Sequence, residues 1–412
     1  MDKHFLANYP QPEEIRKKVA GSEIPDFREV NGHIHTPYSF SSFNDMDEIF
    51  RMAREEAIAV LGINDFFVTH GYESFYKQSL KNRIFPLFNI EFTGLMKSEK
   101  ANGTRINDPN NPGRIYFSGK GLDYPFNPGF LNRIKLNSVI RESQSQMKAM
   151  ITKLNKLITD VNPSLKLSYD EIRNDFAREM VRERHLAKAV RVLAEKKYSD
   201  PGERNQFLAK LYGENKTVTG NGDHAQLENE IRSNLLKSGG RAFVEENEAA
   251  FLDIGRIIKI ILNSGGIPCY PVLLDDAKGR FTEFESDSSK LHKALTELRV
   301  GCIELIPGRN DISILREFVE FFHEKNFIIL FGTEHNTPGL FPLTVVARGG
   351  VPLDNDLKTI AWEGACITAA HQYLRAKGMQ GYILANGMPS FEQKKELSYL
   401  GRLIIEFFLT NN

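Results

Sequence analysis

Residues 311–335, DISILREFVEFFHEKNFIILFGTEH, combine a helix pattern, a strand pattern and a polar end in one stretch. Apolar residues recur at helical spacing over 311–326, and the run FIILF at 327–331 is typical of a buried strand. Another helix-like segment followed by a strand-like segment lies just before this stretch, with SKLHKALTELRVG at 289–301 and CIELIPG at 302–308. Strands that alternate with helices predict a parallel sheet, closed into a barrel or open.

Helix-like segments that precede strand-like segments also recur earlier in the chain. The pairs are 44–59 with 60–65, 72–83 with 84–94, and 245–266 with 267–274. The first of these helices starts with Asp45 and Glu48 three residues later, which is a capping-box pattern. By contrast, residues 130–240 are charged and helical, and they predict an inserted helical subdomain.

Composition excludes some classes of protein. The 53 Lys and Arg cancel the 53 Asp and Glu, so no global field attracts nucleic acid or an anionic membrane; a short nucleotide substrate is not excluded. No stretch is long and apolar enough to span a bilayer. The three cysteines are scattered and form no CxxC motif, which indicates buried thiols in a reducing compartment. We therefore expect a cytoplasmic location.

Two histidines mark the end of a strand-like segment in NGHIHTPYSF, residues 31–40. Side chains alternate in an extended chain, so His33 and His35 point the same way, as two ligands of one metal must. The alternative is a pair of solvated or hydrogen-bonded histidines, which is common for an isolated HxH. Other predicted strands also end in chemically active residues, namely Asp65, Glu91, Glu304, and Glu334 with His335.

The ends of parallel strands meet at one mouth of an α/β barrel, so these residues are expected to converge. Two imidazoles and two carboxylates are suitable ligands for Zn²⁺, Mn²⁺ or Fe²⁺. The motifs NGHIHT, LGINDFFVTHG, FPLFNIEFTG, GGIPCYP and GTEHNTP, in this order, resemble those of the polymerase-and-histidinol-phosphatase (PHP) superfamily. The resemblance extends over roughly residues 30 to 340.

The resemblance implies a distorted seven-stranded βα barrel, similar to a TIM barrel, that hydrolyses phosphoesters with up to three metal ions. The segment RERHLAKAVRVLAEKKY, 182–198, further resembles the helical insertion of the branch that dephosphorylates nucleoside 3′,5′-bisphosphates. The expected organisation has the two parts of the barrel separated by the helical insertion and followed by a C-terminal helical extension. The corresponding segments are 1–128, 129–245, 246–345 and 346–412.

Only one of the metal sites implied by the resemblance is retained. Its ligands match His33, His35, Glu91 and Glu334. At the other sites, family ligands are replaced by Phe40, Phe66, Tyr270 and Asn336. A phenylalanine side chain has no donor atom that can coordinate a metal ion, so we expect one divalent ion, at the retained site. His70 and His335 are alternative donors for the vacated positions, or else solvated histidines.

Further roles are assigned to residues near the expected mouth. Asp65 and His335 are candidates for proton transfer, although Asp65 also fits a turn or a helix cap. Candidates for binding an anionic substrate are Tyr270, Arg184, Arg309 and Lys120. The alternative for each of these cations is an ordinary surface charge.

The leading hypothesis is a divalent-metal-dependent hydrolase, of phosphoesterase type, that acts on a small anionic substrate. The second hypothesis is a degenerate barrel that binds a ligand or a partner without catalysis, its aromatic replacements lining a pocket. A third keeps one metal and hydrolyses a carbon–oxygen or carbon–nitrogen bond. No GxxxxGK[ST], GxGxxG or GxSxG motif points to another class of enzyme. The sequence is compatible with an oligomer.

Overall fold

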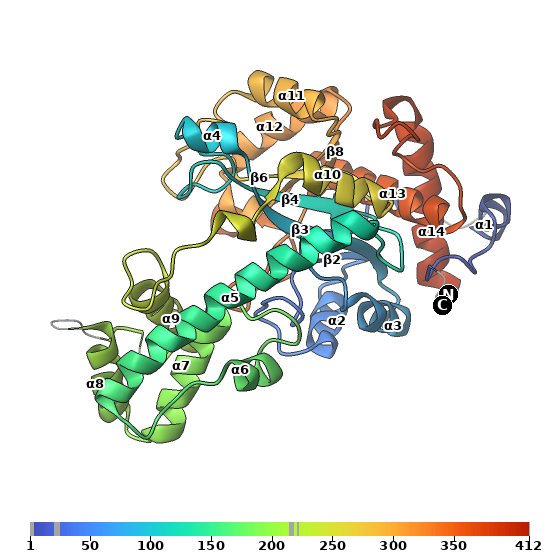
Figure 1. Cartoon of the computed structure of the whole chain (residues 1–412). Coiled ribbons are helices and arrows are strands. Elements are labelled where there is room, and N and C mark those ends of the chain that lie inside the picture. Colours follow the sequence, from blue (N-terminus) through green and yellow to red (C-terminus); the bar gives the residue numbers. More distant parts are fainter. Residues whose placement is uncertain (1–3, 20–24, 214–217, 221, 412) are drawn as a thin grey trace.

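A mixed α/β architecture is seen in the computed structural model, which describes residues 4–19, 25–213, 218–220 and 222–411 (Figure 1). Its main sheet has the strand order β1-β2-β3-β4-β6-β7-β8, and β5 pairs with β3 off this path. These strands are β1 Val30–Ile34, β2 Val60–Phe66, β3 Phe85–Leu95, β4 Arg114–Lys120, β5 Leu252–Asp253, β6 Ile267–Val272, β7 Cys302–Leu305 and β8 Ile328–Phe331.

The sheet curves until its two ends meet. A parallel bridge between Ile34 and Glu334 joins the end of β1 to the residues that follow β8. The pairs β1 with β2, β2 with β3, β6 with β7 and β7 with β8 are parallel, whereas β4 is antiparallel to both β3 and β6. The expected distorted barrel is therefore present, nearly closed, with one reversed strand.

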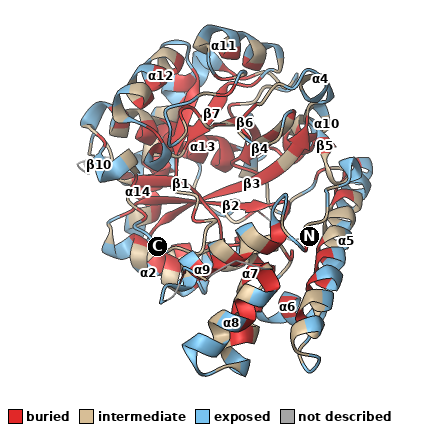
Figure 2. Ribbon diagram, turned by 90° about the vertical axis from the view of Figure 1, so that its left-hand side faces the viewer, coloured by how far each residue is buried: buried red, intermediate tan, exposed pale blue. Residues whose placement is uncertain are grey.

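Amphipathic helices cover the outside of the barrel: α2 Met46–Glu55, α3 Tyr72–Asn82, α10 Ile254–Asn263, α11 Ser288–Glu297 and α12 Ile312–Glu324. The capping pattern expected at Asp45 is formed, because Asp45 Oδ1 accepts from Glu48 N at 2.8 Å. The long strands of the main sheet are buried along almost all of their length, whereas the outer faces of the surrounding helices are exposed (Figure 2). Strands covered in this way need apolar residues on both faces, which is why their sequences read as continuous apolar runs.

The inserted helices project from one end of the barrel (Figure 1). They are α5 Phe130–Val161, α6 Tyr169–Asp175, α7 Glu183–Lys197, α8 Pro201–Tyr212, α9 His224–Ile231 and the π-helix η1 Arg232–Leu236. A separate apolar core holds them together, with Leu154 and Ile158 of α5 packed in one cluster with Leu186 and Val190 of α7. The first half of α5 instead belongs to the barrel core through Leu136.

Helices α13 Asn355–Ala376 and α14 Lys394–Asn411 pack on the barrel beside α1 Pro12–Val19. The Gln372 side chain joins α13 to β3, with Oε1 accepting from Phe88 N at 2.9 Å and Nε2 donating to Pro86 O at 3.1 Å. The short elements are α4 Lys97–Ala101, β9 Val346–Ala347, β10 Val351–Pro352, η2 Glu248–Ala250, η3 Pro307–Arg309, η4 Arg348–Gly350 and η5 Phe391–Gln393. None of the helices in the described ranges is long and apolar enough to cross a membrane.

Candidate metal centre

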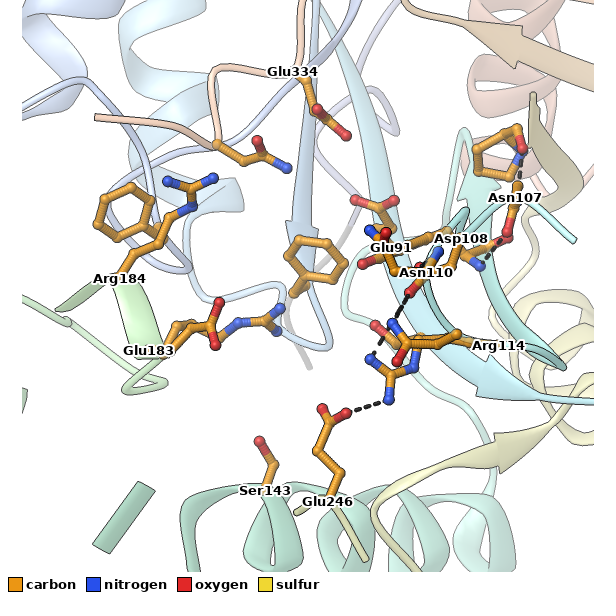
Figure 3. A pocket seen from close by; sticks show the side chains of 18 of the residues that line it. Glu91, Asn107, Asp108, Asn110, Arg114, Ser143, Glu183, Arg184, Glu246 and Glu334 are labelled. Atoms are coloured by element: carbon orange, nitrogen blue, oxygen red, sulfur yellow. Dashed lines mark hydrogen bonds and ion pairs between the residues drawn. The ribbon is translucent and has the colours of Figure 1, made fainter. Parts of the chain in front are cut away.

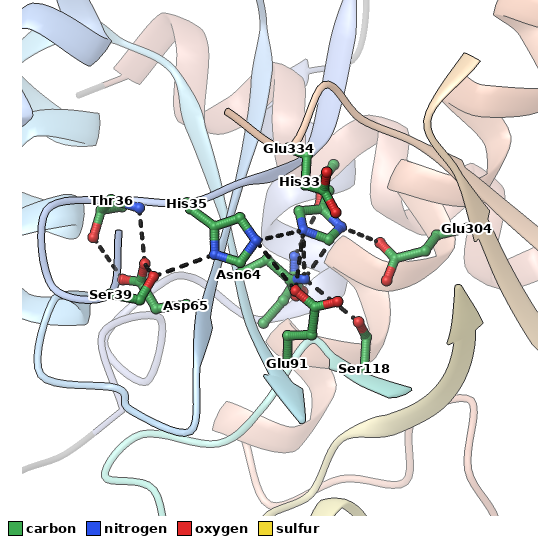
Figure 4. Close-up of polar contacts among 12 residues, drawn as sticks. His33, His35, Thr36, Ser39, Asn64, Asp65, Glu91, Ser118, Glu304 and Glu334 are labelled. Carbon is green, nitrogen blue, oxygen red and sulfur yellow. Dashed lines mark hydrogen bonds and ion pairs between the residues drawn. The ribbon is translucent and has the colours of Figure 1, made fainter. Parts of the chain in front are cut away.

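Three donor atoms meet at the mouth of the barrel. Nε2 of His33 and Nε2 of His35 lie 3.3 Å apart, and Glu91 Oε2 lies 3.6 Å from the first and 3.1 Å from the second (Figure 4). Ligands about 2.1 Å from a tetrahedral metal ion are about 3.4 Å from one another. The cluster therefore has the spacing that one divalent cation requires.

The other nitrogen of each ring is held by a neighbour. Nδ1 of His33 lies 2.9 Å from Glu304 Oε2, and Nδ1 of His35 lies 3.2 Å from Ser39 Oγ. Ser39 in turn donates to Asp65 Oδ1 at 2.7 Å, so Ser39 is left as an acceptor for His35. These contacts fix both tautomers with Nε2 directed inward, as in metal sites generally.

The protonation states favour a cation in the same place. Burial lowers the pKa of both His33 and His35, so their nitrogen lone pairs are free to coordinate. Burial also raises the pKa of Glu91 to about 7. Glu91 Oε2 is buried without a hydrogen-bond partner in the described part of the chain, which is costly unless a cation compensates it. The donor set therefore fits a divalent metal ion.

The carboxylate that contacts His33 Nδ1 belongs to a buried ion pair between Glu304 and Lys120. Nζ of Lys120 donates to Glu304 Oε2 at 2.5 Å and to Asn64 Oδ1 at 3.1 Å. Burial opposes ionisation of Glu304, but Lys120 and His33 outweigh it and hold the pKa of Glu304 well below its usual range. A Glu304 carboxylate that stays ionised is a strong acceptor for the His33 N–H.

The cluster opens into a cavity of about 810 Å³ between the barrel and the inserted helices. Figure 3 shows Glu91 and Glu334 on the barrel side and Glu183, Arg184 and Ser143 on the other. The cationic lining residues are Arg114, Arg182, Arg184, Arg232, Lys237 and Arg309. Arg114, Arg232 and Arg309 pair with acidic residues. Within the described ranges the other three form no ion pair, and the cavity lining as a whole holds as many carboxylates as cations.

A family model matches residues 31–245, more than half of the 412-residue chain, and its description is the PHP domain. The chain belongs to the PHP domain family. This agrees with the resemblance inferred from the motifs, although the specific branch is not distinguished.

Several solved structures are similar to this PHP chain, among them the following two. One is a Bifidobacterium adolescentis protein provisionally named a metal-dependent phosphoesterase, with 13% identity, a TM-score of 0.51, and coverage of 81% of this chain and 95% of that one. The other is an amidohydrolase from Chromobacterium violaceum with bound sulfate and no metal, with 14% identity, a TM-score of 0.48, and coverage of 79% and 91%. A search among curated proteins finds no match. At 13% identity, the likeness to the Bifidobacterium adolescentis structure supports the fold alone.

Glu334, the fourth ligand predicted for this PHP chain, lines the same cavity but lies outside the group of three mutually close donors. Its side chain forms an ion pair with Arg309. Glu334 and His335 both have positive φ, 70° and 56°, which is strained for residues other than glycine. The bonds from His35 N to Glu334 O, 2.8 Å, and from Glu334 N to His33 O, 2.9 Å, hold this turn against β1. The role of Glu334 as a ligand stays a prediction.

The predicted substrate-binding residues divide into two groups. Arg184 and Arg309 line the cavity, whereas Lys120 and Tyr270 are not among the described residues that line it. Lys120 instead binds Glu304. The Tyr270 hydroxyl donates to Glu285 Oε1 at 2.7 Å.

The two residues predicted for proton transfer are also outside the described cavity lining. Asp65 accepts from Thr36 N at 2.8 Å and from Thr36 Oγ1 at 2.5 Å, besides Ser39, and burial raises its pKa to about 6. Nε2 of His335 lies 2.9 Å from Phe341 O. His70, an alternative donor, is exposed, with Nδ1 3.9 Å from Glu179. The catalytic roles of Asp65 and His335 stay predictions.

Sequence reasoning missed the roles of two residues. Glu304 was noted only as a carboxylate at a strand end, and Asn64, whose Nδ2 lies 2.9 Å from His33 Nε2, was not singled out. The signal for Glu304 was its position near the end of β7, whereas Glu91 lies within β3, opposite Phe66 at the end of β2. Asn64 gave no signal beyond its place beside Asp65 in GIND.

Proposed function

We propose that this PHP chain is a divalent-metal-dependent hydrolase that cleaves a phosphoester of a small anionic substrate with a single metal ion. The observation that carries the proposal is the cluster of His33, His35 and Glu91, whose unpartnered Glu91 oxygen opens into a cavity with unpaired cations. Family membership supports the general class of metal-dependent hydrolase.

The metal ion would be held by His33, His35 and Glu91, and Glu334 would complete the set after leaving Arg309. A bound Zn²⁺, Mn²⁺ or Fe²⁺ supplies Lewis acidity and makes water a better nucleophile at neutral pH. Binding also requires the Asn64 amide to give up its contact with His33 Nε2.

The protein's own groups set the ligands in place and receive the substrate. Glu304 and Lys120 orient His33, and Ser39 orients His35. Asp65 fits a positioning role, because its carboxylate acts on His35 through Ser39 rather than facing the cavity.

Arg184 and Arg309 are proposed to bind the anionic group, since guanidinium groups form paired hydrogen bonds with phosphate. Tyr270 contributes indirectly. Its partner Glu285 accepts from Leu273 N at 3.1 Å and so holds the backbone of a residue that lines the cavity.

The cavity volume of about 810 Å³ matches the range for small molecules and admits a short nucleotide. The proposed location is the cytoplasm, a reducing compartment in which the free, buried Cys269, Cys302 and Cys366 are expected.

A second candidate is anion binding without catalysis. The ion pair between Arg309 and Glu334 favours it, because Glu334 is satisfied there by an arginine in place of a metal ion.

Metal affinity separates the two candidates. Titration of the chelator-treated chain with Mn²⁺ and Zn²⁺ should show one ion per chain, and the loaded chain should hydrolyse members of a phosphoester panel. Glu91→Gln should weaken metal binding at least about 100-fold. Removal of a residue that only hydrogen-bonds to a metal ligand already lowers metal affinity about 10–100-fold, and Glu91 is itself a proposed ligand. Glu246→Gln, on the far side of the same cavity, is the matched control. A chain that binds phosphate but no metal would favour the second candidate.

A further inference from the structure

Three large apolar side chains at the start of α5 are left in solvent. Phe130, Leu131 and Ile134 are 77%, 72% and 50% exposed, and the first two are the most exposed large apolar side chains among the described residues. Residues three and four positions apart are neighbours on a helix, so Ile134 lies beside both of the others. The three form one apolar patch, which is typical of a surface that binds something else.

Basic side chains of α5 continue the face that carries this patch. Lys135 is exposed next to it, and the exposed Arg141 follows Ile134 by seven residues, which is about two helical turns. Neither cation forms an ion pair with a described residue. The sequence has no aspartate or glutamate between Asp123 and Glu142. The start of α5 therefore presents apolar and positive groups without a negative one.

Helix α10 adds another positive group beside the patch. Its Arg256 Nη1 donates to Asn132 Oδ1 at 3.0 Å. Its Asn263 Nδ2 donates to Pro128 O, just before α5, at 3.1 Å. Lys259 lies between Arg256 and Asn263 at helical spacing, so it is on the face of α10 that borders α5, and it is exposed. Cations thus flank the patch from two helices.

This combination of groups fits the surface of an anionic lipid bilayer. The whole chain carries 53 basic and 53 acidic residues, so the attraction is confined to this surface. Exposed apolar side chains enter the boundary between lipid headgroups and acyl chains, and adjacent Lys and Arg attract anionic headgroups. The apolar patch and the surrounding cations supply both kinds of contact.

A protein partner fits the same surface less well. A symmetric dimer through the patch would bring the same cations of two copies together, and like charges repel across an interface. Three apolar side chains are also few compared with the roughly 20–30 residues that each partner contributes to a stable protein interface. A bilayer needs no matching surface of defined shape.

We propose that the start of α5 is a membrane-docking surface, on which the apolar patch inserts into an anionic bilayer and the flanking cations bind its headgroups. This inference is independent of the proposed hydrolase function. The start of α5 lies on the side of the barrel away from the inserted helices (Figure 1). The chain reaches it from the end of the antiparallel β4, opposite the strand ends that form the metal centre. A docked chain therefore keeps the mouth of the barrel accessible.

Flotation of the full-length chain with lipid vesicles tests the apolar patch. Vesicles of phosphatidylglycerol and phosphatidylcholine in roughly equal amounts should bind the wild-type chain. Vesicles of phosphatidylcholine alone should bind at least about tenfold more weakly. Leu131→Ser should weaken binding to the anionic vesicles at least about fivefold, because it removes an inserted side chain. Leu340→Ser, at a leucine that is 48% exposed in the loop after β8, is the matched control and should stay within about twofold.

Charge reversal tests the cations in the same assay. Lys135→Glu should weaken binding at least about fivefold, whereas Lys395→Glu, at an exposed lysine of α14, should stay within about twofold. Wild-type chain that ignores anionic vesicles, or equal losses in Leu131→Ser and Leu340→Ser, would overturn the proposal. A dimer in sedimentation that Leu131→Ser dissociates would also overturn it, because a second copy would then cover the patch.

Discussion

Nδ1 of His33 lies 2.9 Å from Oε2 of Glu304, so the imidazole is held by a carboxylate on one side while its other nitrogen faces Glu91. In Figure 4 the contacts continue from His33 through His35 and Ser39 to Asp65. This sequence of contacts orients both imidazoles before any ion arrives. The metal centre is therefore preorganised by residues that do not themselves bind the metal.

Replacement of Glu304 by glutamine tests this support. A neutral amide is a weaker acceptor for the His33 N–H, and we expect Glu304→Gln to lower metal affinity about 10–100-fold. Competition with a fluorescent chelator for Zn²⁺ measures the change, with Glu183→Gln as a control on the cavity wall. Equal affinities in wild type and Glu304→Gln would show that the contact does not tune the site.

Lys120 is fully buried and neutralises Glu304. Lys120→Met should destabilise the fold by about 3–5 kcal/mol, because it leaves a buried carboxylate without its cation. The double variant Lys120→Met with Glu304→Gln should recover much of that loss, since neither buried charge remains. Urea unfolding measures both. A double variant as unstable as Lys120→Met alone would contradict this explanation.

His371 predicts a pH dependence of stability. Burial lowers its pKa to about 4, and its ring lies between Gly265 O, 2.6 Å from Nε2, and Tyr382 N, 3.0 Å from Nδ1. Because the folded-state pKa lies below the unfolded value of about 6.5, its stabilising contribution is present above pH 6.5 and is lost as pH falls towards 4.

His371→Gln should therefore reduce the slope of unfolding free energy between pH 6 and 4.5 by up to about 1.4 kcal/mol per pH unit. Urea unfolding at several pH values gives the slope. His224→Gln, at a mostly exposed histidine, is the control and should leave it unchanged. Parallel slopes for wild type and His371→Gln would rule out this contribution.

Close packing of α13 and α14 depends on Gly401. A Cβ at this position would overlap the carbonyl oxygen of Cys366, so Gly401→Ala has to push the two helices apart. We expect a loss of about 1–3 kcal/mol, measured by thermal or urea unfolding. Gly339→Ala, where a Cβ meets nothing within 4 Å, should be close to neutral. A neutral Gly401→Ala would show that the two helices adjust freely.

Local sequence patterns predicted a parallel sheet of strands alternating with helices, because helix and strand periodicities are short-range properties. The resemblance of the motifs to the PHP superfamily, not the periodicity, implied that this sheet closes into a barrel. The strand patterns also predicted the convergence of His33, His35 and Glu91 because strand ends share one mouth. The reversal of β4 was not predictable in this way, since its partners are set by contacts with β3 and β6 that are distant in sequence.

Side-chain partners across the barrel were the other feature that sequence could not supply. Lys120 was expected to meet substrate, yet its ammonium binds Glu304, 184 positions away. Likewise, the sequence indicated for Phe66 only the replacement of a metal ligand. In the structure its ring contacts the insertion, because the guanidinium carbon of Arg182 lies 4.3 Å from the ring centre. Such pairings follow from how distant segments pack, and no periodicity encodes them.

The central claim is that one divalent ion binds between His33, His35 and Glu91. The most direct test is an anomalous difference map from crystals soaked with Mn²⁺ or Zn²⁺ and measured at the absorption edge of that metal. A single strong peak within bonding distance of His33 Nε2, His35 Nε2 and a Glu91 carboxylate oxygen is expected. A peak elsewhere, or none at millimolar metal, would contradict the account.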